Sequence, residues 1–230
     1  HDFCKGLKNL LSDSGVLVIE FPHVKNLILN LQYDTIYHEH FSYFSLYSIR
    51  DIAARFGLIL FDVEEIDTHG GSYRIYLGQK SANPRIGENV QNVLDKEKDH
   101  GLLNLETYTN FQSKVDSLKY DILNKLIELK KSGARIGAYG AAAKGSTAFN
   151  YFGIRPDLIE FVCDRAPSKV GKYLPGCHIP IVPENFLKEQ KPDYIVIIPW
   201  NIRSEIVKQL SYAKEWGGQF MTLIPNIEIF

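Results

Sequence analysis

The second half of the chain places the tightest constraint on the fold, because strand-like and helix-like segments alternate there. Apolar runs at residues 135–139, 158–163, 194–198 and 220–224 are separated by segments with helical character. Strands that alternate with helices build a parallel sheet with helices on both faces. We therefore expect residues 133–230 to form a small Rossmann-like domain of α/β class.

The first part of the chain has a different order. Residues 1–80 contain helical patterns and three strand-like runs, and the run at 16–19 is continuously apolar. Such a run is typical of a strand buried on both faces of a parallel sheet. The order of elements predicts the last part of a sheet without its beginning. Residues 81–132 are helical and are interpreted as a connector. Since the chain starts at His1 rather than methionine, we expect it to be the later part of a longer protein.

Charge and composition argue against several kinds of partner. The formal net charge of -1 gives no electrostatic reason to expect nucleic acid or an anionic membrane. No apolar run approaches the ~18 residues that a membrane-spanning helix needs. The three cysteines, Cys4, Cys163 and Cys177, form no paired spacing. We therefore expect a small-molecule ligand, no zinc knuckle, and a reducing, cytoplasmic location.

A loop follows a strand-like run at 15–21 and a helical-looking run at 24–31, and precedes a helix pattern at 46–56. It concentrates reactive side chains at Tyr37, His38, Glu39 and His40. An imidazole suits proton abstraction near neutral pH, and a neighbouring carboxylate can orient it. A phenol can donate a hydrogen bond to a developing oxyanion. The set therefore fits removal of a proton beside a carbonyl. Two alternatives stay open: a metal site, although the HExxH zinc pattern is incomplete, and a polar surface loop without catalysis.

A second candidate is the polar turn that contains His69, Gly70, Gly71 and Ser72, with Arg74 shortly after it. Bare glycine amides can line a ligand, and an arginine can hold an anion. The same residues also fit an ordinary glycine hairpin between two strands.

A third candidate lies between a predicted strand and a predicted helix, at residues 137–146. Its small residues, Gly140 among them, let a ligand approach the backbone, helix amides favour phosphate, and Lys144 adds a positive charge. Asp164 ends the next strand, where an acidic group can bind ribose hydroxyls. The spacing matches neither GxGxxG nor the Walker sequence. Close packing of the helix on the strand is therefore the alternative to a nucleotide site.

Trp200 and Asn201 follow a later strand and belong to the same ligand-binding edge. Trp200 can stack on a base, or it can be part of the core. Asn201 is a good N-cap, so we expect a single helix over residues 202–216.

In combination and in this order, the motifs resemble the S-adenosylmethionine-dependent sugar C-methyltransferases. The resemblance rests on YHEHFSY at 37–43, HGGS at 69–72, GAAAKG at 140–145 and PWN at 199–201. These enzymes methylate a carbon of nucleotide-linked keto-deoxysugars. They consist of a small zinc-binding domain, a central methyltransferase domain and a C-terminal Rossmann-like domain.

The resemblance implies an assignment for each part of the chain. Residues 1–80 would be the end of a class I methyltransferase sheet, and residues 133–230 would be the C-terminal domain. Neither the zinc cysteines nor the glycine-rich loop that holds S-adenosylmethionine is present in the chain. The chain by itself is therefore expected to bind the methyl donor poorly and to be inactive.

By the same resemblance, His40 would be the general base that removes the proton beside the sugar ketone. Tyr37 and Glu39 would hold the sugar and stabilise the enolate, without any metal. The residues expected to contact the substrate are His38, Tyr43, His69, Gly70, Gly71, Ser72, Arg74, Gly140, Lys144, Ser146, Asp164, Trp200 and Asn201. Two other hypotheses stay open: an NAD(P)-dependent oxidoreductase, and a nucleotide-sugar-binding module without catalysis.

Overall fold

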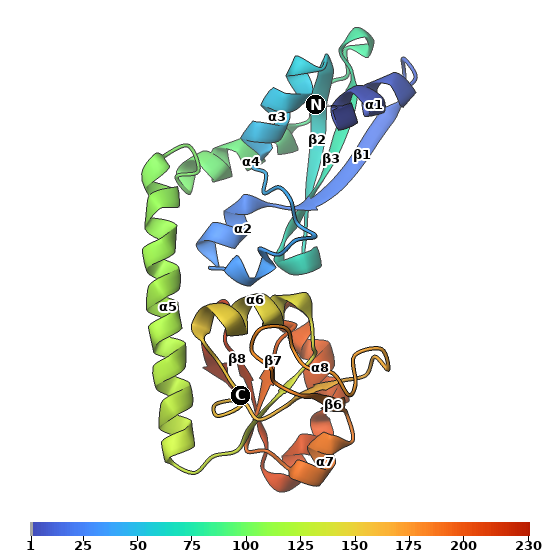
Figure 1. Ribbon diagram of the computed structural model, residues 1–230. Coiled ribbons are helices and arrows are strands. Elements are labelled where there is room, and N and C mark those ends of the chain that lie inside the picture. Colours follow the sequence, from blue (N-terminus) through green and yellow to red (C-terminus); the bar gives the residue numbers. More distant parts are fainter. Residues whose placement is uncertain (1) are drawn as a thin grey trace. The chain divides into compact units, whose positions relative to one another are not determined.

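A computed structural model describes residues 2–230, and the chain divides into two compact units (Figure 1). The first unit comprises the chain up to Leu29 together with Ser42–Asn110, and the second comprises Asn30–Phe41 together with Phe111–Phe230. This division differs from the predicted boundaries, because segment 30–41 groups with the C-terminal part and the helical connector contributes residues to both units. The predicted α/β class is confirmed. The assignment of residues 1–80 to a methyltransferase domain stays a prediction.

The first unit is built on a three-stranded antiparallel sheet in the order β1-β3-β2. Its elements are α1 (Asp2–Leu10), β1 (Val16–Pro22), α2 (Val24–Leu29), α3 (Leu46–Arg55), β2 (Leu58–Ile66), η2 (Thr68–Gly70), β3 (Ser72–Gln79), η3 (Lys80–Ala82), α4 (Glu88–Asp99) and the start of α5 (Leu105–Lys131). β2 and β3 form the predicted hairpin, which closes through η2. Side chains from the sheet, α3 and α4 make one apolar core.

Strand β1 departs from the sequence-based expectation of a strand in a parallel sheet, buried on both faces. It lies at the edge of the sheet and pairs antiparallel with β3, with Val16 opposite Gly78. Val16 is 54% exposed and Val18 is 51% exposed, whereas Leu17 and Ile19 pack against the core. Successive side chains of a strand point to opposite faces. The apolar run therefore has one covered face and one open face within residues 2–110.

Two local interactions fix where α3 begins. The Ser45 hydroxyl accepts a hydrogen bond from the Ser48 N–H, which makes a capping box. Glu97 of α4 is fully buried and accepts from the N–H groups of Leu46, at 2.8 Å, and Tyr47, at 3.3 Å. A carboxylate at this position satisfies N–H groups that have no partner inside the helix. Glu97 therefore ties α4 to the start of α3.

The second unit is the predicted Rossmann-like arrangement. Its elements are η1 (Tyr33–Thr35), the rest of α5, β4 (Ile136–Tyr139), α6 (Ala143–Phe152), β5 (Val162–Asp164), β6 (Ile181–Pro183), α7 (Phe186–Gln190), β7 (Tyr194–Ile197), η4 (Trp200–Ile202), α8 (Arg203–Gln209), η5 (Ser211–Trp216), β8 (Gln219–Thr222) and β9 (Glu228–Ile229). The strand order is β6-β5-β4-β7-β8-β9, and only β9 runs antiparallel to its neighbour.

This order creates a topological switch point between β4 and β7. The chain moves outward from β4 to β5 and β6, and then returns to the other side of β4 with β7. In open α/β sheets, ligands bind in the crevice outside the carboxyl ends of the strands at such a point. The loops that follow β4 and β7 are therefore the place to look for function in this unit.

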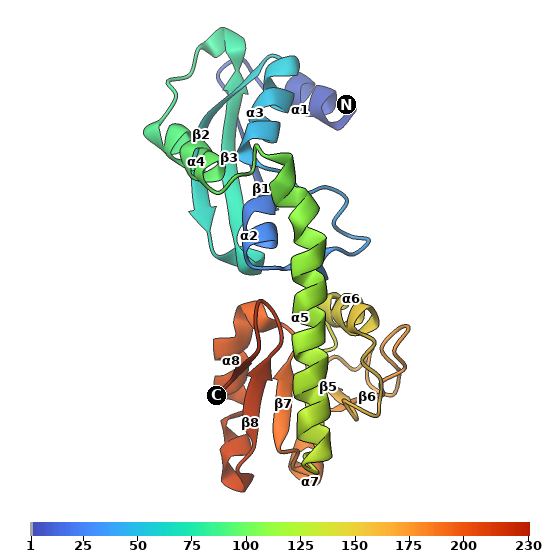
Figure 2. The same cartoon turned by 90° about the vertical axis from the view of Figure 1, so that its left-hand side faces the viewer.

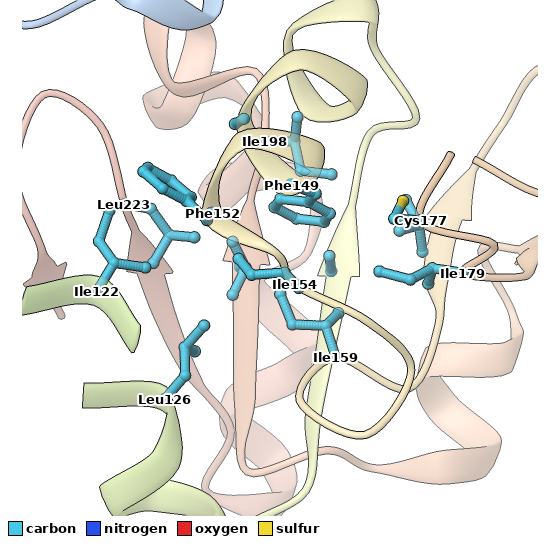
Figure 3. Packing of buried hydrophobic residues seen from close by; sticks show 14 of the residues in the cluster. Ile122, Leu126, Phe149, Phe152, Ile154, Ile159, Cys177, Ile179, Ile198 and Leu223 are labelled. Atoms are coloured by element: carbon cyan, nitrogen blue, oxygen red, sulfur yellow. The ribbon is translucent and has the colours of Figure 1, made fainter. Parts of the chain in front are cut away.

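Helices cover both faces of the second sheet, with α8 on the face opposite α5 (Figure 2). Along β7, Val196 and Ile198 belong to the core formed with α5 and α6, whereas Ile195 and Ile197 belong to the core formed with α7 and α8. Figure 3 shows Phe149 and Phe152 of α6 in the first of these cores, and the apolar stripe of α5 also contributes to it. The two cores hold the carboxyl edge of the sheet rigidly.

The prediction of a single helix over residues 202–216 is wrong. The segment divides into the short elements η4, α8 and η5, and Asn201 caps none of them. The Asn201 Oδ1 atom instead accepts a hydrogen bond from the Lys144 ammonium at 2.8 Å. The amide oxygen of Asn201 therefore accepts from a side chain on another element instead of capping a helix.

Candidate functional site

A short turn of the chain occupies the switch point of the second unit. This turn is η1, whose Thr35 hydroxyl donates to the Gln32 carbonyl at 2.7 Å. The indole N–H of Trp200, in the loop after β7, donates to the Asp34 carboxylate at 2.7 Å. The Tyr33 ring packs against the aromatic rings of α6. The chain itself therefore fills the position where an open Rossmann-like fold would take a ligand.

Asp34 is the most deeply buried carboxylate at this edge, with 1% exposure. Its Oδ2 atom accepts from Trp200, and its Oδ1 atom has no hydrogen-bond partner within residues 2–230. Burial raises the pKa of Asp34 to about 6, although Trp200 and the Lys144 charge oppose the shift. A cavity of only about 20 Å³ lies beside it, which leaves room for about one water molecule.

Lys144 also points into the protein. It is 7% exposed, and its ammonium lies 4.1 Å from the centroid of the Trp200 ring and donates to Asn201. Burial lowers the pKa of Lys144, and the charge of Asp34 opposes this. These contacts combine a cation–π interaction with a hydrogen bond. Lys144 is therefore bonded to Asn201 and stacked on the half-buried Trp200 in this structure. The roles of the three residues as substrate ligands stay predictions.

Gly140 is required by the turn after β4. Its φ is +88°, and a Cβ at this position would lie 2.5 Å from the ring of Pro199. Both facts explain the glycine without a ligand. Asp164 bonds the turn after β4 and its own loop: its carboxylate accepts from the N–H groups of Ala141 and Ala166 at 2.7 and 2.8 Å, and it pairs with Lys169 at 3.3 Å.

The four reactive residues of the 37–40 loop all belong to the second unit. His40 is half-buried, and its Nδ1 atom lies 2.9 Å from the Thr35 carbonyl oxygen. A carbonyl oxygen can only accept, so Nδ1 carries the hydrogen and the lone pair of the neutral imidazole is on Nε2. The Tyr37 ring lies 4.3 Å from the His40 ring between centroids. His38 and Glu39 are exposed.

An open cleft of about 470 Å³ adjoins this loop within the second unit. One wall is formed by Tyr37, His38 and Glu39, and a second by the start of α6 at residues 141–147. A third wall is the loop of residues 168–175. Ala142, at the N-cap of α6, has no side chain that can accept a hydrogen bond. The first N–H groups of α6 thus meet the cleft without a side-chain cap, in the geometry that favours an anion.

The sequence analysis missed the third wall of this cleft, which brings Ser168, Lys169, Lys172 and Tyr173 to its edge. It also missed Asp34. The signal for the wall was its density of lysines after the second strand of the parallel sheet. Ser146 also lines the cleft, and its role as a substrate ligand stays a prediction.

The remaining predicted ligands, His69, Gly70, Gly71, Ser72, Arg74 and Tyr43, belong to the first unit. The buried Ser72 donates to the Thr68 carbonyl at 3.0 Å. Arg74 pairs with Glu20 and Glu64 on the neighbouring strands, each at 3.2 Å. Tyr43 is half-buried, and His69 is exposed.

The glycines of this turn have a packing reason. The Asn26 amide donates to the Gly70 carbonyl at 3.0 Å, and a Cβ on Gly71 would lie 2.1 Å from the same amide. The φ of Gly71 is +120°, a value that side chains rarely allow. The ligand roles of these residues stay predictions.

Within residues 2–230, no group of three or more metal-ligating side chains comes together. None of the helices described there combines the length and apolarity that crossing a bilayer requires.

Comparison with known proteins adds an independent observation. A family model described as C-methyltransferase C-terminal domain matches residues 67–225. The chain is 33% identical over 226 residues to C-methyltransferase NovU of Streptomyces niveus. The match covers 98% of this chain but 54% of that relative, so the chain spans about half of the relative's length.

Proposed function

Because the chain belongs to the C-methyltransferase C-terminal domain family, we propose that it serves C-methylation of a nucleotide-linked keto-deoxysugar. In this proposal the second unit binds the sugar nucleotide and removes the proton beside its ketone. The observation that carries the proposal is the contact of the His40 Nδ1 atom with the Thr35 carbonyl, in the same loop as Tyr37 and Glu39, which line the cleft although His40 itself does not.

His40 acts as the general base. Its Nδ1–H donates to the Thr35 carbonyl, which leaves the basic lone pair on Nε2. A histidine held in this way needs no reorganisation before it accepts a proton. The Tyr37 ring packs on the imidazole and reaches the cleft, so its phenol is the donor for the oxyanion that develops as the proton leaves. Glu39, exposed on the same wall, accepts from sugar hydroxyls.

The diphosphate of the substrate binds at the opposite walls. The uncapped start of α6 offers backbone N–H groups and the positive end of the helix dipole. Lys172 is exposed at the cleft, and Lys169 lies beside it while it bonds the Ala141 carbonyl at 2.9 Å. In this proposal these groups take the phosphate-binding role that was predicted for Lys144, whose ammonium donates to Asn201.

The methyl donor that we propose is S-adenosylmethionine, which supplies an electrophilic methyl group to the carbanion. Residues 2–230, which the structure describes, do not form a cradle for it. The sheet of the first unit is antiparallel, and β1 leads into α2 through Pro22 and His23 without a glycine-rich turn. We therefore assign no step to residues that would hold the donor.

An NAD(P)-dependent oxidoreductase is less compatible with this geometry. A dinucleotide would need the switch point, where η1 and Trp200 lie, and a free acidic group for its ribose. The Asp164 carboxylate is already bonded to two backbone N–H groups and to Lys169. We therefore do not carry this alternative forward.

The test separates proton removal from methyl transfer. The full-length protein is incubated with a nucleotide-linked keto-deoxysugar in D₂O without methyl donor, and loss of the proton beside the ketone is followed by NMR. We expect exchange with the wild type and at least ~100-fold slower exchange with His40→Gln. The matched control is His100→Gln, because the Nδ1 atom of His100 also contacts a backbone carbonyl, that of Lys96 at 2.6 Å. Undiminished exchange in His40→Gln would rule out His40 as the base, and exchange lost equally in both variants would point to a nonspecific effect.

A further inference from the structure

The buried Asp34 and the half-buried Trp200 have no part in the proposed chemistry, yet Asp34 lies three residues before the loop that does. We propose that Asp34 and Trp200 are positioning residues that hold the imidazole of His40 in its Nδ1–H tautomer. The kinetic consequence rests on the proposed function, whereas the structural claim does not.

One residue of backbone, Thr35, connects Asp34 to the imidazole of His40. Trp200 donates to the Asp34 carboxylate at 2.7 Å, and the next residue, Thr35, presents its carbonyl oxygen to the Nδ1 atom of His40 at 2.9 Å. The same carbonyl accepts from the N–H of Tyr37 at 3.1 Å. One carbonyl group therefore fixes both the base and the residue that stacks on it. The position of the Thr35 carbonyl depends on how η1 is anchored.

The anchor is rigid on its other side. Trp200 lies in the loop directly after β7, and β7 is buried along its apolar residues between the two cores of the sheet. The Lys144 ammonium, 4.1 Å from the indole centroid, and its bond to Asn201 hold the ring from α6. An indole fixed by a strand end and a helix start gives the turn a defined position relative to the cleft.

Because Asp34 is buried, its carboxylate needs a hydrogen-bond partner inside the protein. Asp34 is 1% exposed, and its second oxygen has no hydrogen-bond partner within residues 2–230. A buried acceptor of this kind costs free energy, so the bond from Trp200 to the other oxygen is the interaction that compensates part of that cost. The adjoining cavity of about 20 Å³ is far too small for a cofactor or substrate group. Positioning of the turn is the remaining use that the geometry supports.

The first experiment reads the tautomer directly. Long-range ¹H–¹⁵N spectra of the imidazoles of this chain, recorded at about pH 8.5, distinguish Nδ1–H from Nε2–H histidines. His40→Gln identifies the signal of His40. We expect a single Nδ1–H form in the wild type and a mixture of both tautomers in Trp200→Phe and in Asp34→Ala, because each variant breaks the anchor. Asp34→Asn keeps an acceptor for the indole N–H and should restore the single form.

The matched control is Trp216→Phe. Trp216 lies in the same unit, and its indole N–H donates to a backbone carbonyl, that of Pro192, at 3.1 Å. A general loss of order in the unit would change the His40 signal in this variant too, and that result would overturn the proposal. An unchanged Nδ1–H signal in Trp200→Phe and Asp34→Ala would overturn it as well.

The second experiment measures kinetics in the full-length protein. We expect Trp200→Phe to lower kcat for methyl transfer, or the rate of proton exchange, by about tenfold, with KM for the sugar nucleotide changed less than about twofold. The Asp34→Ala/Trp200→Phe double variant should be no slower than the slower single variant, because both changes break one contact. Additive losses would contradict a shared anchor. If the wild type itself exchanges no proton, the proposed function fails, and the tautomer spectra still decide the structural claim.

Discussion

Replacing Asp34 by asparagine should make the second unit more stable at neutral pH and remove a pH dependence from its unfolding. Burial raises the pKa of Asp34 from 3.8 to about 6. The folded state therefore binds this proton more tightly than the unfolded state does. The resulting stabilisation is complete below about pH 3.8 and is lost as the pH rises through about 6. Asparagine keeps an acceptor for Trp200 and carries no charge at any pH.

The magnitude follows from the shift. A difference of about two pKa units corresponds to roughly 3 kcal/mol at 1.36 kcal/mol per unit. The groups that act on the carboxylate are Lys144 from α6, Trp200 from η4, and the Tyr33 side chain and the backbone N–H groups of Asp34 and Thr35 from its own turn. The attraction of Lys144 already opposes the shift, so it is part of this figure. We expect Asp34→Asn to equal the wild type near pH 4 and to exceed it by up to ~3 kcal/mol near pH 7.5.

The assay is urea unfolding followed by tryptophan fluorescence at a series of pH values. Both tryptophans of the chain, Trp200 and Trp216, belong to the second unit, so the signal reports on that unit. All other groups titrate in both proteins, and the difference between the two curves isolates Asp34. The control is Asp121→Asn, an exposed carboxylate on α5 of the same unit. A difference between wild type and Asp34→Asn that stays constant within about 0.5 kcal/mol from pH 4 to pH 7.5 would refute the reasoning.

Three further changes test other parts of the structure. Gly140→Ala should destabilise the second unit by about 2–3 kcal/mol in the same assay, because its Cβ would meet a proline ring at 2.5 Å. Gly171→Ala, which has a similar φ of +82° and open space around it, should cost only about 1 kcal/mol, and equal losses would contradict the steric argument. Glu97→Ala should speed hydrogen exchange in the first turn of α3 by an amount equivalent to about 3 kcal/mol, and unchanged exchange would show that the buried carboxylate does not hold this helix. Lys172→Ala should weaken calorimetric binding of thymidine diphosphate about tenfold, whereas the exposed Lys208→Ala should leave it unchanged. Equal affinities in both lysine variants would remove Lys172 from the phosphate site.

Much of the fold was predictable because it depends on local patterns. The alternation of strand and helix after residue 133 predicted the parallel sheet, and the apolar stripe of α5 predicted a long helix with one buried face. These signals arise from the periodicity of side chains, which a sequence carries directly. The prediction that residues 16–19 are buried on both faces of a parallel sheet was wrong, because an apolar run does not show which faces of a strand are covered by neighbouring elements. The helix expected over 202–216 failed because Asn201 bonds a residue on another element.

The candidate site was only partly predictable. Residue types identified the 37–40 loop, since a phenol, two imidazoles and a carboxylate rarely occur together without a reason. Their packing in the second unit, rather than with the strand and helix on either side of them in the sequence, was not visible. Lys169 and Lys172 of the 168–175 loop were likewise not predicted as residues of the site.

By itself, the sequence determined the α/β class, the order of most elements and the residue types available for proton transfer. The tertiary structure alone decided which polar groups face a ligand and which face the protein. Lys144, Trp200 and Asn201 follow parallel strands, and the structure shows that Lys144 contacts the other two and that the Trp200 indole bonds Asp34 of η1. The physical reason is that a buried polar group must find a partner, and the partner for Trp200 is Asp34, 166 residues away in the chain.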